Sequence, residues 1–282
     1  MPAGPGGPIM VSMTTSTEPE EAFQIPIEAA EFYESAFVPA FFAQWAPILC
    51  ESAGVAPGQA VLDVACGTGI AARTAADRVA PDGRVVGVDL NEAMLTVARR
   101  VRPDIEWRQG NAGGLPFPDG SFDTVLCQMA LMFFPDRRGS LQEMGRVVRP
   151  GGTVALVVPS RLEAQVAFSP FVDMAARHAG SEAMSLLSTY FACGDLDELI
   201  GLVESAGLRV GGARAHVGTY RAPSVDAFVT TEVESTPLVE RISTEVYLRI
   251  RADAHQVLSP FTAPDGSIEA AFECLVVAAS RP

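Results

Sequence analysis

Apolar residues along the chain follow two kinds of pattern, short continuous runs and helical spacing. Short apolar runs bounded by turn signals predict buried strands, and apolar residues three or four positions apart predict helices. Strands are predicted at 60–64, 84–88, 105–109, 124–127, 153–158, 208–220 and 270–279. Helices are predicted at 70–79, 92–101, 141–148 and 196–206, and also within 27–54, 161–192 and 224–258. Strands that alternate with helices in this way predict an α/β, doubly wound sheet.

Composition and turn signals suggest how the chain is divided. Pro39 and Pro47 are expected to break the first helical stretch into two or three short helices. The expected parts are a flexible tail (1–22), a helical lid (23–57), a core (58–160), cap helices (161–192), and the rest of the core (193–282) with a cap insertion at 224–258.

One glycine turn carries the most informative signal. Residues 61–69 read Val-Leu-Asp-Val-Ala-Cys-Gly-Thr-Gly, a strand that runs directly into a turn and a helix start. Glycine permits the turn and lets the backbone approach a ligand, and the N–H groups at the helix start face that ligand. Residues 67–72 also satisfy the relaxed dinucleotide pattern G-x-G-x-x-A, which alone is a weak signal.

Asp63 favours one ligand over the other. A carboxylate four residues before Gly67 repels a pyrophosphate and attracts an ammonium group. The stretch resembles the first motif of class I S-adenosylmethionine-dependent methyltransferases, in which the corresponding acid serves the methionine end of the cofactor. An NAD-dependent oxidoreductase is therefore the weaker interpretation.

Later segments extend this resemblance in the family's order. Asp89 ends the second strand, where an acid can accept hydrogen bonds from both ribose hydroxyls. Gly110-Asn111-Ala112 resembles the family's Asp-Ala step at the adenine, with an Asn in place of the acid. The run Pro-Phe-Pro-Asp-Gly-Ser-Phe-Asp (116–123) and the Arg-Pro-Gly-Gly turn (149–152) are similar to those of ubiquinone and menaquinone biosynthesis methyltransferases.

The resemblance implies a Rossmann-like, seven-stranded, mostly parallel sheet whose last strand is antiparallel, capped by helices. It implies S-adenosyl-L-methionine as cofactor, S-adenosyl-L-homocysteine as product, and in-line methyl transfer to a small-molecule O, N or C nucleophile. The lid tyrosine is expected near the methionine carboxylate. The cofactor set expected from these segments is Tyr33, Asp63, Ala65, Cys66, Gly67, Thr68, Gly69, Asp89, Leu90, Met94, Gly110, Asn111, Ala112, Gln128 and Met129.

Composition limits the kinds of molecule that the protein is expected to bind. The net charge is −14 and all 20 basic residues are Arg, so a nucleic-acid substrate is not expected. Five scattered cysteines and three histidines predict neither a metal site nor disulfides, which suits a cytoplasmic protein. No secretory signal or membrane span is predicted. Met10 and Met13 leave an alternative start or an added tail open, and a monomer or homodimer is expected.

The catalytic residues are less well determined by the sequence. His178 in the expected cap is the candidate general base, whereas His216 and His255 are expected to be structural or exposed. Phe133, Phe134 and Glu232 are candidates for the acceptor pocket, the last to orient a polar acceptor. Because no base is evident, a protein that binds the cofactor without methyl transfer stays an alternative. Arsenite methylation lacks a characteristic cysteine pairing, and quinone, lipid or antibiotic-type acceptors stay open.

Overall fold

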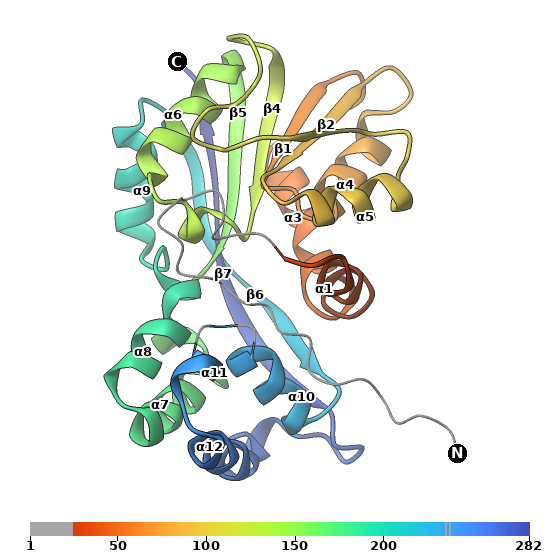
Figure 1. The fold of residues 1–282 in the computed structure, drawn as a ribbon. Helices are drawn as coiled ribbons and strands as arrows, with labels where there is room; N and C mark the ends of the chain where they lie inside the picture. The colour runs from red at the N-terminus through yellow and green to blue at the C-terminus, as the bar shows by residue number, and fades with distance from the viewer. Residues whose placement is uncertain (1–24, 235, 237) are drawn as a thin grey trace, which may run out of the picture.

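The computed structural model describes residues 25–234, 236 and 238–282. The tail expected at 1–22 lies outside the described residues. The upper part in Figure 1 is a sheet flanked by helices, and the lower part is a group of helices reached by two long strands. These long strands are continuous from the sheet into the lower part, so they connect the two.

The sheet has seven strands in the order β3-β2-β1-β4-β5-β7-β6. The first five in this order pair in parallel, and β7 is antiparallel to both β5 and β6. The strands are β1 Ala60–Val64, β2 Arg84–Asp89, β3 Glu106–Gln109, β4 Phe122–Gln128, β5 Val148–Pro159, β6 Arg209–Ala222 and β7 Ile268–Ser280. The predicted α/β, doubly wound, mostly parallel sheet is confirmed.

Helices cover both faces of this sheet. In Figure 1, α3, α4 and α5 lie on one face and α6 and α9 on the other. Successive strand residues serve opposite faces: Val61 packs with the first group of helices, and Leu62 packs with the second. These helices are α3 Trp45–Ser52, α4 Ile70–Val79, α5 Glu92–Val101, α6 Arg137–Val147 and α9 Leu196–Ser205. Burial on both faces explains why the strands read as continuous apolar runs.

The lower helices form a cap around the ends of β6 and β7. The cap consists of α7 Phe168–Ala179, α8 Ser181–Leu187, α10 Val225–Val229, the π-helix η6 Thr230–Glu234, α11 Leu238–Arg241 and α12 Thr244–Val257. Helix α12 packs on α7, and α11 packs on α8. Segments 161–192 and 224–258, far apart in sequence, therefore meet in one body (Figure 1).

The N-terminal helices pack against the core rather than against the cap helices. They are α1 Ile27–Phe32, the π-helix η1 Tyr33–Phe37, α2 Val38–Ala40 and the 3-10 helix η2 Phe42–Gln44, followed by α3. Helix α1 contacts α5, and α3 contacts α4. The break lies at Phe41, whose φ of −139° leaves the helical region.

Two element predictions need correction. Pro47 does not break a helix, because it is the third residue of α3, where its missing N–H has no intrahelical partner to lose. Helix α6 begins at Arg137, four residues before the predicted start. Asp136 caps it by accepting a hydrogen bond from the Gly139 N–H, and its first turn has no apolar periodicity.

In the described part of the chain, no helix has the length and apolar character to cross a bilayer. All five cysteines are buried free thiols.

Candidate active site

A cavity of about 840 Å³ lies where the N-terminal helices, the core and the cap meet. Its core wall is built at the carboxyl ends of β1, β2 and β4. Strand β1 lies between β2 and β4. The strands β2 and β3 lie on one side of β1, and β4 and β5 lie on the other, so the strand order reverses at β1. Ligands of doubly wound sheets bind at such a switch point. The lining is predominantly apolar and aromatic, with a few polar side chains.

The glycine turn between β1 and α4 faces this cavity through Gly67. Ala65, Gly67 and Gly69 have φ values of 56°, 54° and 89°, the left-handed region that favours glycine. A Cβ on Gly67 would lie 3.9 Å from the Tyr33 ring, so the backbone here is open to the cavity beneath the lid.

Gly69 and Thr68 have different roles from the one expected. A Cβ on Gly69 would come within 2.1 Å of the Trp107 ring, so this glycine allows the helix start to pack on β3. Thr68 is buried. Neither residue lines the cavity, unlike the other thirteen predicted cofactor residues. The packing of Gly69 on Trp107 gives that glycine a structural role, and neither residue has a cavity contact that would support the predicted cofactor contact.

Asp63 combines a structural and an electrostatic role. Its Oδ2 accepts a hydrogen bond of 2.8 Å from the Ala72 N–H in the first turn of α4, a turn whose N-cap, Gly69, has no side chain to supply it. Burial, opposed by this hydrogen bond, raises the pKa of Asp63 to about 7. A cationic group next to Asp63 would lower that pKa and stabilise the carboxylate, so the site favours an ammonium ligand.

Asp89 connects the second strand to the glycine turn. Its Oδ2 accepts from the Gly67 N–H at 2.7 Å, and its Oδ1 accepts from the Asn91 N–H at 2.8 Å. Burial raises its pKa, and the backbone hydrogen bonds oppose this shift. Asn91 caps α5 by accepting from the Met94 N–H, which leaves Asp89 available to a ligand. The Leu90 backbone also hydrogen-bonds to this carboxylate, and a carboxylate with three such donors keeps acceptor capacity for a ribose hydroxyl.

The residues that were expected to contact the adenine also belong to this cavity. Leu90, Met94, Gly110, Asn111 and Ala112 all line the cavity next to Asp89. The Asn111 Oδ1 already accepts a hydrogen bond from the Gly113 N–H at 2.8 Å, so a ligand amino group would use its remaining lone pair.

Tyr33 closes the cavity over Gly67. Its ring packs on Phe42, with centroids 4.9 Å apart, and burial raises the pKa of its hydroxyl well above the usual value. Its neighbour Glu34 forms a two-pronged ion pair with Arg73 of α4, at 2.7 and 3.1 Å. A planar guanidinium paired in this way fixes orientation as well as distance, and it holds the lid against the core.

The far side of the cavity has a polar pair that the sequence pattern did not reveal. The Tyr220 hydroxyl at the end of β6 donates to Glu232 Oε1 of η6 at 3.1 Å. Burial raises the pKa of Glu232 to about 7, and the hydrogen bond from Tyr220 opposes the shift. Glu232 was predicted to face the acceptor. Tyr220 lacks a local signal, because only the fold brings it opposite η6.

The remaining predicted pocket residues come from the end of β4. Gln128, Met129, Phe133 and Phe134 all line the cavity. Gln128 donates from Nε2 to the Phe42 backbone oxygen at 3.1 Å, which connects β4 to the N-terminal helices. Met129 has a φ of 55°, a strained value for a residue with a side chain, and such strain is concentrated at functional sites.

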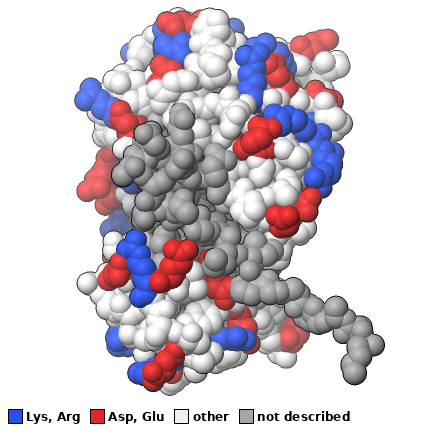
Figure 2. All heavy atoms as spheres, in the orientation of Figure 1, with Lys and Arg blue, Asp and Glu red and all other residues white. Residues whose placement is uncertain are grey.

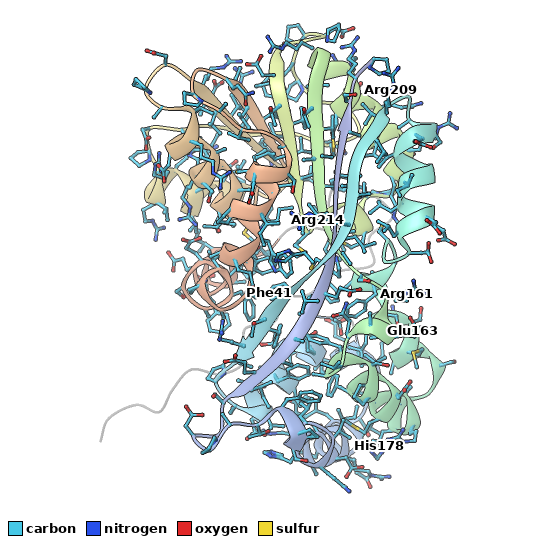
Figure 3. All side chains as sticks on the ribbon, turned by 180° about the vertical axis from the view of Figure 1, so that it is seen from behind. Phe41, Arg161, Glu163, His178, Arg209 and Arg214 are labelled. Atoms are coloured by element: carbon cyan, nitrogen blue, oxygen red, sulfur yellow. The ribbon has the colours of Figure 1, made fainter. Side chains whose placement is uncertain are left out.

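The structure does not support His178 as the base. Its Nε2 lies 2.8 Å from Asp253 Oδ2, between α7 and α12, and it is not among the cavity-lining residues. Figure 3 shows it at the far end of the cap, whereas Phe41 lies where the sheet and cap meet. His216 lies beside Arg214 on β6, and His255 pairs with Asp226, so both have the non-catalytic surroundings that were expected.

Comparison with known proteins agrees with this geometry. A methyltransferase-domain family model matches residues 62–156. A demethylmenaquinone methyltransferase of Symbiobacterium thermophilum is 35% identical over 194 residues, which covers 58% of this chain and 77% of that protein. The chain belongs to the class I S-adenosylmethionine-dependent methyltransferases.

Other relatives match over shorter stretches. The ubiquinone/menaquinone biosynthesis C-methyltransferase of Hahella chejuensis is 40% identical over 119 residues, 40% of this chain and 48% of that protein. The chain thus spans about half the length of several curated relatives that it matches. A methyltransferase-like structure from Bacillus halodurans has a TM-score of 0.58 at 22% identity, covering 84% of this chain and 98% of its own. At this level of sequence identity, the structural similarity shows a shared fold only.

Proposed function

We propose that the cavity binds S-adenosylmethionine along the core wall and transfers its methyl group to a small apolar acceptor held on the cap side. One observation carries the proposal. The same cavity is lined by the glycine turn with Asp63 and Asp89 at one end, and by cap residues such as Tyr220 and Glu232 at the other. A single space therefore has room and chemistry for both reactants.

The roles of the core residues follow from their positions. Asp63 attracts the ammonium group of the methionine end, and Asp89 accepts from the ribose hydroxyls. Leu90 and Met94 contact the adenine, whose edge Asn111 reads. Tyr33 covers the glycine turn and excludes water. When bound, the cofactor supplies a methyl group activated by a positive sulfur, so the protein mainly has to orient the acceptor in a dry site.

The cap end of the cavity favours an acceptor with a largely apolar, ring-sized skeleton. Phe168, Tyr220, Phe228 and Phe272 form a cluster whose ring centroids lie 5.0–6.4 Å apart. Three of these four line the cavity, so they can contact the faces of a bound ring. The names of the quinone-biosynthesis relatives support an aromatic acceptor of quinone type as one member of this class.

The surface gives no comparable support for a nucleic-acid acceptor. In Figure 2, basic and acidic side chains are interspersed on the face shown, and no broad basic area is visible among the described residues of that face. Many Arg residues are paired with acids, as Arg102 is with Asp77 and Asp104. Together with the net charge of −14, this favours a small molecule.

Methyl transfer is tested with isotopically labelled S-adenosylmethionine and a panel of apolar aromatic acceptors, with extraction of the labelled product. Asp89→Asn should reduce turnover at least about tenfold, because the loss of a charged acceptor costs about 1.5–3 kcal/mol. Glu92→Gln is the matched control, because Glu92 is an exposed acid on α5 that pairs only with Arg99 among the described residues. Equal turnover in both variants would contradict the assignment of Asp89.

A further inference from the structure

The cap end of the cavity contains several acceptor oxygens. Glu232 and Glu234 both lie on η6 and line the cavity, and Gln128 lines it from the end of β4. Gln128 Oε1 and Glu234 Oε2 are buried and have no hydrogen-bond partner within the described structure. Buried polar atoms are usually satisfied, so these oxygens point to a ligand that donates hydrogen bonds.

Glu232 is a carboxylate that is held without a cation. Its Oε1 accepts from the Tyr220 hydroxyl, and no ion pair to Glu232 occurs among residues 25–234, 236 and 238–282. The nearest charged groups of the surrounding elements have other partners. These pairs are Arg221 with Glu269, Arg251 with Asp226, Arg241 with Glu182, and Glu234 with the Tyr247 hydroxyl.

Tyr220 fixes the position of Glu232. The tyrosine ring is 8% exposed and packs against Phe168, Phe228 and Phe41, with centroids 5.0, 5.4 and 5.6 Å away. A side chain held on three sides cannot follow a moving carboxylate, so the hydrogen bond orients Glu232 relative to the cavity. The π-helix that carries Glu232 is the kind of local irregularity found at functional sites.

From this arrangement we infer that the acceptor presents an ionisable, phenol-type hydroxyl to the Tyr220–Glu232 pair, and that Glu232 takes its proton. The inference rests on the proposed methyl transfer and specifies its substrate class. Glu232 is the catalytic residue, because it touches the acceptor, and Tyr220 is a positioning residue.

The step balances without another reactant. The hydroxyl O–H bond breaks and the proton goes to Glu232, which leaves a phenolate in the aromatic end of the cavity. The methyl carbon forms its new bond to that nucleophile, and the electron pair of the broken carbon–sulfur bond stays on sulfur. The proton then leaves Glu232 for solvent when the product dissociates.

A hydroxyl fits the site better than an amine. The raised pKa means that Glu232 is only partly ionised near neutral pH, so it provides no full negative charge for an ammonium group. A base whose pKa lies near the working pH suits proton removal from a neutral donor. An ammonium would also have to give up its hydration in a mainly apolar cavity.

The test uses 2-naphthol and an alkylamine counterpart, 2-(aminomethyl)naphthalene, which is an ammonium ion near neutral pH, with the full chain. Each is titrated by calorimetry into protein saturated with S-adenosylhomocysteine, and methyl transfer is followed by mass spectrometry of the product. Wild type should bind and methylate 2-naphthol in preference to the amine. Glu232→Gln should lower kcat by a factor of about 10²–10⁴ and change KM much less.

The pH dependence of kcat distinguishes a role of Glu232 in proton transfer from a purely structural role. In wild type, kcat for 2-naphthol should rise with pH and level off above about 7. This rise of kcat with pH should be absent from Glu232→Gln. Tyr220→Phe removes the hydrogen bond that lowers the pKa of Glu232, so its profile should move to higher pH. Asp253→Asn, in the same cap but paired with His178, should behave as wild type.

The outcomes separate the two proposals. If S-adenosylhomocysteine fails to bind wild type, the proposed function itself fails. If it binds but 2-naphthol does not, or if the amine is the better substrate, the acceptor class is wrong. If 2-naphthol turns over equally well in wild type and Glu232→Gln, Glu232 does not take the proton.

Discussion

Cofactor binding should release a proton from Asp63. The carboxyl group is buried and has a pKa of about 7, so at pH 7 it is about half protonated before a ligand binds. An ammonium group placed next to it would lower the pKa of Asp63 from about 7 back toward the ordinary range of an aspartate. Binding at pH 7 should therefore release about half a proton.

The same shift predicts how affinity depends on pH. Because binding lowers the pKa, protonation competes with the ligand, and the affinity should increase as the pH rises through 7. Between pH 6 and pH 8 the increase is about tenfold, or about 1.4 kcal/mol, since the protonated fraction falls from about 0.9 to about 0.1. Above pH 8 the contribution of Asp63 should level off.

The assay is calorimetry with S-adenosylhomocysteine at pH 7 in phosphate and in Tris, two buffers with different heats of ionisation. The slope of the observed heat against the buffer heat gives the number of protons released. Asp63→Asn is the matched control, because its side-chain oxygen can still accept from the Ala72 N–H while the titratable group is gone. Subtracting the slope for Asp63→Asn from the slope for wild type removes the contribution of any proton that the ligand or Asp89 releases.

An equal slope in wild type and Asp63→Asn would refute this reasoning. It would mean either that Asp63 is ionised in the empty site or that the ammonium group lies elsewhere. An affinity that does not change between pH 6 and pH 8 would lead to the same conclusion.

Four further predictions concern single residues. Asp89→Ala should weaken S-adenosylhomocysteine binding by about 1–3 kcal/mol in calorimetry, and an unchanged affinity would remove it from the site. Gly67→Val should abolish binding while the circular dichroism spectrum stays native. Gly69→Ala, by contrast, should lower the free energy of unfolding by about 1–3 kcal/mol in urea, because its Cβ would come 2.1 Å from Trp107. Glu232→Gln should raise the stability at pH 8 by about 1–3 kcal/mol but not at pH 4. Wild type loses stability as the pH rises from about 4.5 to 7, because the unfolded chain has released the Glu232 proton there while the folded protein still holds it. Equal melting temperatures at pH 8 would contradict this.

The core could be predicted from the sequence because its signals are local. The strand at Ala60–Val64 and the helix at Ile70–Val79 have the predicted bounds, since an apolar run, a glycine turn and a helical pattern follow each other directly. The positions of Asp63 and Asp89 at strand ends determine where they lie in a parallel sheet. Both line the cavity.

The cap end depended on contacts that no local pattern contains. Tyr220 and Glu232 are brought together by the turn from β6 into the cap, and the aromatic rings of Phe41, Phe168 and Phe228 around Tyr220 come from three different segments. Gly69 fits the cofactor pattern in sequence, but the ring of Trp107, thirty-eight positions later, fills the space beside it. His178 has the chemistry of a base, but α7 directs it toward Asp253 and away from the cavity.

The most direct test of the account is a parallel calorimetric titration of the purified protein with S-adenosylmethionine, S-adenosylhomocysteine and NAD. The account predicts that both sulfur-containing ligands bind and that Gly67→Val abolishes their binding, whereas NAD gives no heat of binding. Binding of NAD with no binding of S-adenosylmethionine or S-adenosylhomocysteine would contradict the assigned roles of Asp63, Asp89 and the glycine turn.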